Sequence, residues 1–151
     1  MKKVLFVLLV FSFTLPACKD ENPYAGDCFV PDASVNSTIN MELPEYYNLR
    51  NLGEYIVINQ GNKGIYLIHN YDDLYYAIER TCTYESEREC SQIQLNPKTL
   101  QLRCGTESDT GFISCCASTF SFNSTVLTGP ARCNLKTYKV SQSGNSLYVR
   151  N

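Results

Sequence analysis

Residues 118–131 read Ser-Thr-Phe-Ser-Phe-Asn-Ser-Thr-Val-Leu-Thr-Gly-Pro-Ala, and residues 135–140 continue as Leu-Lys-Thr-Tyr-Lys-Val. Residues 147–150, Leu-Tyr-Val-Arg, follow after a turn at residues 142–145, Gln-Ser-Gly-Asn. Two apolar runs on either side of a turn that contains Gly, Asn and Ser are typical of a β-hairpin. The chain is therefore expected to close on two antiparallel strands.

The same signals recur upstream in short segments. Residues 37–43 alternate between apolar and polar side chains, which is the period of a half-buried strand. The other expected strands are joined by turns and comprise residues 54–59, 64–69, 74–79, 92–95 and 99–103. No segment has the apolar period of a helix. We therefore predict an all-β fold, a small antiparallel β-sandwich or barrel of about eight to ten short strands.

The block from residue 118 to residue 140 resembles the C-terminal half of a Rieske iron–sulfur domain. In that family the second cluster-binding loop, Cys-Pro-Cys-His-Gly-Ser-x-Phe, precedes a Gly-Pro-Ala turn and a closing Leu-x-x-Tyr-x-Val hairpin. Phe120, Gly129-Pro130-Ala131 and residues 135–140 fit this plan without a gap. The resemblance extends over about residues 35–151. It implies a Rieske-like β domain, of the kind found in small bacterial lipoproteins with degenerate cluster ligands.

The resemblance also assigns the cluster positions, which in this family are two thiolates on one iron and two imidazoles on the other. Residues 77–84 match the first loop, so Cys82 takes the first thiolate position and Tyr84 the first imidazole position. Aligning Phe120 on the family's phenylalanine puts Ile113 at the second thiolate position and Cys116 at the second imidazole position. Three of the four positions therefore do not match.

The sequence contains one histidine, His69, in the expected strand at residues 64–69. We interpret it as a half-exposed strand residue rather than as a ligand or a base. With one imidazole and a broken pattern, we expect no two-iron two-sulfur cluster, no metal and no other cofactor. One alternative stays open, an all-thiolate cluster or a zinc site, although no cysteine pair has the usual short spacing. Its ligands would be Cys82, Cys90, Cys104 and either Cys115 or Cys116.

The N-terminus carries an export signal. Met1-Lys2-Lys3 is basic, residues 4–15 are almost entirely apolar, and Leu15-Pro16-Ala17-Cys18 resembles the lipobox of bacterial lipoproteins. The apolar run is too short for a membrane span, which needs about 20 residues. We therefore predict a signal peptide at residues 1–17, lipid attachment at Cys18, an anchor and tether at residues 18–34, and the β domain at residues 35–151. The alternative is an ordinary signal peptide followed by an incidental cysteine.

The location follows from the same segment. Lys19-Asp20-Glu21 is similar to the tag that sends some lipoproteins to the outer face of the outer membrane. We expect a cell-envelope protein that is lipid-anchored to the outer membrane of a Gram-negative bacterium. Surface display is a hypothesis, and a plain solvated linker is the alternative.

Export also decides how the cysteines are interpreted, because disulfides persist outside the cytoplasm. Seven cysteines remain after Cys18, enough for three bridges and one odd thiol, and their pairing cannot be deduced from the sequence. The Rieske resemblance implies a bridge between the two cluster loops, from Cys115 to Cys90 or Cys82, and we name Cys28 to Cys133 as a second pair. A redox-active vicinal Cys115–Cys116 disulfide is an alternative. The disulfide candidates are Cys28, Cys82, Cys90, Cys104, Cys115 and Cys133.

The net charge and the motifs in the sequence limit which classes of function are expected. The net charge of −2 falls to −4 once Lys2 and Lys3 leave, and no basic stripe occurs, so nucleic acid is not an expected partner. The expected partners are the membrane, through the lipid anchor, and an unidentified protein or small molecule. No catalytic motif occurs, so we do not expect an enzyme. We favour a non-catalytic structural or binding module. The alternative is an electron-transfer or thiol-redox lipoprotein with a cysteine-ligated metal or disulfide centre.

Overall fold

The computed structural model describes residues 28–151, so the expected signal peptide and Cys18 lie outside the described residues. Within this range the prediction of an all-β fold is confirmed, with ten strands and one short 3-10 helix, η1 (Tyr47–Arg50). The strands are β1 (Asn36–Asn40), β2 (Tyr55–Ile58), β3 (Ile65–His69), β4 (Tyr75–Glu79), β5 (Ile93–Asn96), β6 (Gln101–Ser108), β7 (Gly111–Phe120), β8 (Val126–Thr128), β9 (Thr137–Ser143) and β10 (Ser146–Arg150).

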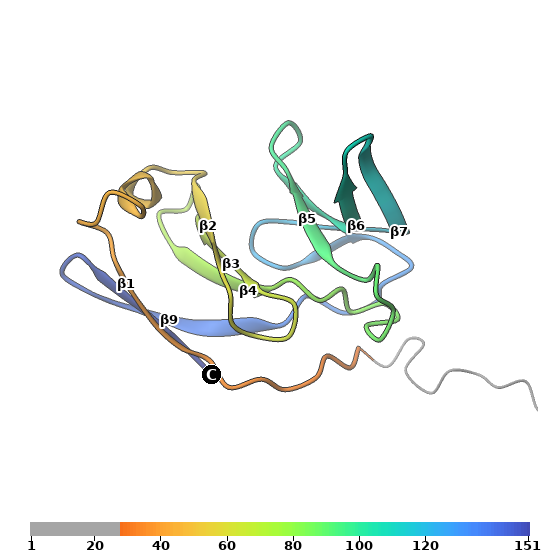
Figure 1. Cartoon of the computed structure of the whole chain (residues 1–151), viewed down its shortest axis with the longest axis horizontal. Helices are drawn as coiled ribbons and strands as arrows, with labels where there is room; N and C mark the ends of the chain where they lie inside the picture. The colour runs from red at the N-terminus through yellow and green to blue at the C-terminus, as the bar shows by residue number, and fades with distance from the viewer. Residues whose placement is uncertain (1–27) are drawn as a thin grey trace, which may run out of the picture.

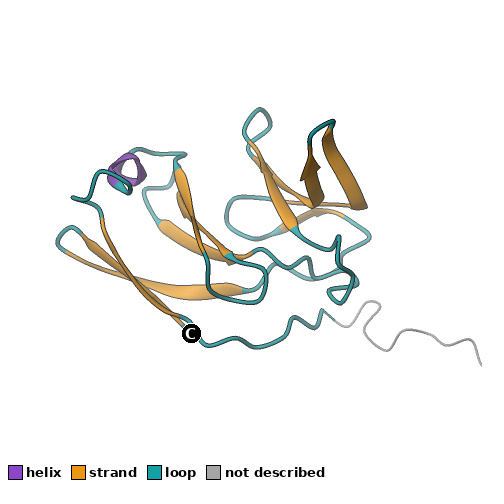
Figure 2. Ribbon diagram, viewed as in Figure 1, coloured by secondary structure: helices purple, strands orange, loops and turns teal. Residues whose placement is uncertain are grey.

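The strands form two antiparallel sheets. The first has six strands in the order β1-β10-β9-β4-β3-β2, and the second has four in the order β5-β6-β7-β8 (Figure 1). The closing hairpin is β9 and β10, as the C-terminal turn predicts. The hairpin is added to the sheet through β9, which pairs with β4 and places Tyr138 opposite Ala77. The chain therefore returns from the four-stranded sheet to complete the six-stranded one, and the two sheets lie beside each other (Figure 2).

Strand β3 lies between two hydrophobic cores. All five of its residues are buried. Ile65 and Leu67 face the core of the six-stranded sheet, whereas Tyr66 and Ile68 face a second core shared with the four-stranded sheet. Successive side chains of a strand point to opposite faces, so burial on both sides explains why this segment is a nearly continuous apolar run.

The sequence analysis did not predict three of the elements, which are η1, β7 and β8. Of these, β7 is the longest strand in the described residues, with ten residues. Strand β7 lacks a two-residue burial period, since residues 113–117 are all at least partly exposed and only Ser118 and Phe120 near its end are buried. Its pairing with β6 also shifts register part-way along. An irregular strand of this kind has no period for a sequence pattern to reveal.

Residues 28–34, expected as part of the tether, contact the domain. Cys28 is bonded to Cys133, and the Lys136 Nζ lies 2.6 Å from a carboxylate oxygen of Asp32. Val30 is buried as well. Among residues 28–151, no helix has the length and apolar character needed to cross a bilayer.

Candidate metal centre

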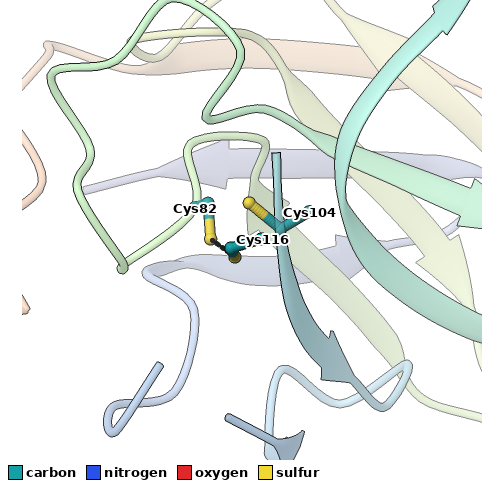
Figure 3. A group of neighbouring side chains, drawn as sticks. All are labelled: Cys82, Cys104 and Cys116. Atoms are coloured by element: carbon teal, nitrogen blue, oxygen red, sulfur yellow. Dashed lines mark hydrogen bonds between the residues drawn. The ribbon is translucent and has the colours of Figure 1, made fainter. Parts of the chain in front are cut away.

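Three cysteine thiols meet where the two sheets approach each other (Figure 3). Cys82 lies in the loop after β4, Cys104 on β6 and Cys116 on β7. Their sulfur atoms all lie within 4.8 Å of one another, and the Cys82 and Cys116 sulfurs are 3.9 Å apart. Cys82 and Cys104 are completely buried, and Cys116 is partly buried. Thiols from three separate segments thus form one cluster, which we call the thiol site.

A β-bulge places two of the three thiols. Arg103 pairs with Thr119 and Gly105 pairs with Ser114, so residues 115–118 of β7 all lie opposite one residue of β6, Cys104. Bulges of this kind bend a strand and redirect side chains. Here the extra residues bring Cys116 toward Cys104. Gly105 is required beside the bulge, because a Cβ atom at this position would collide with the main-chain carbonyl of Ile113.

The third thiol is positioned by the backbone after β4. Thr81 forms an isolated bridge with Gln92, and the Cys82 N–H donates to the Ser91 carbonyl at 3.2 Å. The Ser91 hydroxyl donates to the Tyr84 carbonyl at 2.8 Å, which closes residues 82–91 into a loop. We call this segment the Cys82 loop. Its ends are thus fixed next to β5, and Cys82 is held toward β6 and β7.

The carboxylate of Glu79 anchors the start of this loop. Glu79 is completely buried, and its oxygens accept hydrogen bonds from the N–H groups of Asn62 and Lys63, both at 2.9 Å. They also accept from the Thr81 hydroxyl at 2.9 Å and the Tyr138 hydroxyl at 2.7 Å. Buried charges are tolerated when they are hydrogen-bonded in this way. Glu79 therefore joins the β2–β3 turn, β9 and the residue before Cys82.

Hydrogen bonds among the three thiols shift their pKa values in different directions. The bonds with Cys104 and Cys82, together with the contact between the Cys116 sulfur and the Ser118 hydroxyl at 3.2 Å, lower the pKa of Cys116. The same hydrogen bonds to Cys116 and Cys82, together with burial, raise the pKa of Cys104. For Cys82, the hydrogen bond with Cys104 lowers the pKa, but the bond to Cys116 and burial outweigh it and raise the pKa. Of the three thiols, Cys116 is thus the one whose pKa is lowered.

Sulfur atoms that bind one metal ion at about 2.3 Å lie about 3.8–4.0 Å apart in tetrahedral or trigonal geometry. The 3.9 Å separation between Cys82 and Cys116 is already at this value, and the other separations need to shrink by less than about 1 Å. Deprotonated thiols are also the soft ligands that copper(I), zinc and iron–sulfur centres use. The expectation that this chain has no metal or cofactor site is therefore wrong, because the fold gathers three thiols that can hold a metal.

The donor set does not fit a two-thiolate, two-imidazole cluster. His69 pairs with Tyr75 at the start of β4, whereas Cys82 follows the end of that strand. Its Nε2 lies 2.9 Å from an Asp73 carboxylate oxygen, and its ring stacks on Tyr75 at 4.3 Å. His69 is also only 5 % exposed, so the prediction of a half-exposed residue is wrong. The reason is that β3 lies between β2 and β4 with both faces covered.

Of the other two positions assigned by the resemblance, Tyr84 lies beside the thiol site, where its backbone forms a hydrogen bond with Cys82, and Ile113 lies apart from it. Tyr84 is partly buried against the core that contains Cys82. Ile113 is 54 % exposed and pairs with Thr106 on β6, beyond the bulge. Cys82 and Cys116 are brought together, and Cys104 joins them. Sequence reasoning named Cys104 only as a disulfide or broad thiolate candidate. Its alternation with buried Leu102 on β6 was the available signal that it points inward.

Two disulfides flank the thiol site. Cys90 is bonded to Cys115, and Cys28 is bonded to Cys133. The first joins the Cys82 loop to β7 next to Cys116, and a surface depression of about 520 Å³ opens beside it, lined in part by Arg88 and Thr106. Cys82 and Cys104, which were also disulfide candidates, are free thiols, and a vicinal Cys115–Cys116 bond is absent from the described residues.

Two of the solved structures to which this chain is similar are a Rieske protein and a ferredoxin. One is the plasma membrane Rieske protein PetC3 of the cyanobacterium Synechocystis PCC 6803, 23 % identical over 64 % of this chain and 86 % of that one, with a TM-score of 0.49. The other is the ferredoxin of carbazole 1,9a-dioxygenase from Nocardioides aromaticivorans IC177, 14 % identical over 79 % of this chain and 98 % of that one, with a TM-score of 0.45. Comparisons with protein-family models and with curated protein sequences found no match.

Proposed function

We propose that this chain is a lipid-anchored protein of the cell envelope whose Rieske-like domain binds a thiophilic metal ion. The ligands are the thiolates of Cys82, Cys104 and Cys116. The observation that carries the proposal is their convergence, since the loop after β4 and the paired strands β6 and β7 bring three sulfur atoms within 4.8 Å of one another. Metal binding displaces the protons of the thiols, so the metal affinity depends on pH.

The disulfide pattern supports this function. An exported chain matures where thiols oxidise, and four of its cysteines are paired. The three at the thiol site remain free although the Cys82 and Cys116 sulfurs are near each other. A bound metal ion occupies the thiolates that would otherwise react with an oxidant, because the thiolate is the reactive form. Metal binding therefore accounts for free thiols in an oxidising compartment.

The role we infer is binding rather than catalysis. The only imidazole in the sequence is engaged by Asp73 and Tyr75, and it lies at the other end of β4 from the thiol site. Lipid attachment at Cys18 would hold the domain at the outer membrane of a Gram-negative bacterium. A protein or small molecule would be its partner there. Protease digestion of intact cells tests surface display. A protein on the cell surface would be digested, whereas a protein inside the envelope would be protected until the cells are broken.

The deciding experiment is metal analysis of the mature protein purified without oxygen. Zinc, copper and iron are measured together with acid-labile sulfide, and non-reducing peptide mapping reports the cysteine pairing. We expect one equivalent of metal in the wild type and less than about a tenth of that in Cys82→Ser, Cys104→Ser and Cys116→Ser. The matched control is Cys28→Ala/Cys133→Ala, which removes two cysteines outside the thiol site and should keep its metal. Metal-free wild type with three reactive thiols would contradict the proposal.

A second function has one specific observation in its favour, the 3.9 Å between the Cys82 and Cys116 sulfurs. In a thiol-redox protein these two thiols would form a disulfide, releasing two protons and passing two electrons to an external disulfide, which becomes two thiols. Peptide mapping separates this case from metal binding. A Cys82–Cys116 peptide in metal-free protein would favour the redox function.

A further inference from the structure

The ammonium group of Lys63 lies against the Cys82 loop and bonds to its backbone. It lies in the turn between β2 and β3, and its backbone N–H donates to the buried Glu79 carboxylate at 2.9 Å. Its ammonium donates to three main-chain carbonyls of the loop, those of Ser86 at 3.2 Å, Arg88 at 2.7 Å and Ser91 at 3.0 Å. An ammonium has three N–H donors, and here each has a carbonyl acceptor. Lys63 thus holds the Cys82 loop, which also contains Cys90 of the Cys90–Cys115 disulfide.

The same ammonium is partly buried, with thiols and carboxylates around it. Burial lowers the pKa of Lys63, while attraction to Cys104, Cys82, Glu87 and Glu79 acts in the opposite direction. A partly buried charge is costly when it has no partner. The three loop carbonyls are the hydrogen-bond partners that keep this ammonium in place.

We propose that Lys63 is a positioning residue for the thiol site, which fixes the Cys82 loop through three of its carbonyls and so holds Cys82 in place to bind a metal ion. This inference rests on the proposed function, and Zn²⁺ is the probe of metal binding. The ion itself binds to sulfur, and Lys63 contacts the loop rather than the metal.

The test compares Lys63→Met, Lys63→Arg and the control Lys139→Met, at an exposed position on β9. Zn²⁺ affinity is measured by competition with a chromophoric chelator under reducing, oxygen-free conditions at fixed ionic strength. Loss of the three hydrogen bonds to the loop should weaken binding about tenfold in Lys63→Met. Lys63→Arg keeps a cation with N–H donors for the loop carbonyls and should stay within about threefold of the wild type, as should Lys139→Met. Unchanged affinity in Lys63→Met would overturn the inference.

A second readout works on the metal-free protein. Amide hydrogen exchange is followed at Arg88, Ser91 and Gln92, whose N–H groups bond within the Cys82 loop. We expect at least about tenfold faster exchange in Lys63→Met, with Lys63→Arg and Lys139→Met close to the wild type. This separates the two claims. Wild type that binds no Zn²⁺ would defeat the proposed function, whereas unchanged loop exchange in Lys63→Met would defeat the role of Lys63.

Discussion

The hydrogen bond between Tyr138 and Glu79 offers a direct test of how the thiol site is supported. Tyr138 is 6 % exposed and its hydroxyl donates to a completely buried carboxylate at 2.7 Å. Tyr138→Phe keeps the ring and its packing but removes the donor. A hydrogen bond to a charged group contributes about 1.5–3 kcal/mol, and a buried carboxylate that loses a donor is left partly unsatisfied. We expect the free energy of unfolding to fall by about 2 kcal/mol.

The assay is urea unfolding of the mature protein, followed by far-ultraviolet circular dichroism with both disulfides intact. The transition midpoint should fall while the dependence of the free energy on urea stays constant, because the surface exposed on unfolding is unchanged. Tyr148→Phe is the matched control, since the Tyr148 ring lies beside Arg150 on the terminal strand. It should change stability by less than about 0.5 kcal/mol. Equal effects of the two substitutions would refute the reasoning.

Four other outcomes are expected. Burial and the hydrogen bond to Glu79 raise the pKa of Tyr138, so its phenol stays protonated in the folded protein at a pH where the unfolded chain, near about pH 10, loses this proton. The free energy of unfolding should therefore fall as the pH rises above about 10, and it should fall less in Tyr138→Phe. Unfolding curves at successive pH values measure this. Cys90→Ala/Cys115→Ala opens a loop with a sequence separation of 25 and should cost about 3.5 kcal/mol in urea unfolding, and a loss under about 1 kcal/mol would contradict this. Gly105→Ala puts a methyl group against the Ile113 carbonyl and should lower both melting temperature and metal content, whereas Gly144→Ala, at a turn with open space around it, should keep its metal. Cys18→Ser should abolish labelling by radioactive palmitate and release the protein from the membrane fraction; labelling that persists would refute lipid attachment at Cys18.

Several features of the fold could be predicted from the sequence because they are local. The hairpin of β9 and β10 is specified by two apolar runs and a turn that contains Gly144. The strands β2, β3 and β4 are likewise close in sequence and joined by turns, so their apolar runs were enough to find them. The predicted strands missed β7, because its burial pattern is irregular and its register against β6 shifts.

The thiol site, in contrast, could not be predicted from local sequence. The sequence by itself predicted an export signal and determined a set of alternating strands, one histidine and a cysteine-rich chain, since each of these depends on residue type and short-range spacing. Only the tertiary structure decided that Cys104 joins Cys82 and Cys116 while Cys90 pairs with Cys115. The physical reason is that these contacts depend on a bulge between β6 and β7 and on a loop held by Glu79 and Lys63. Such long-range register is fixed by packing across two sheets, which spacing along the chain does not encode.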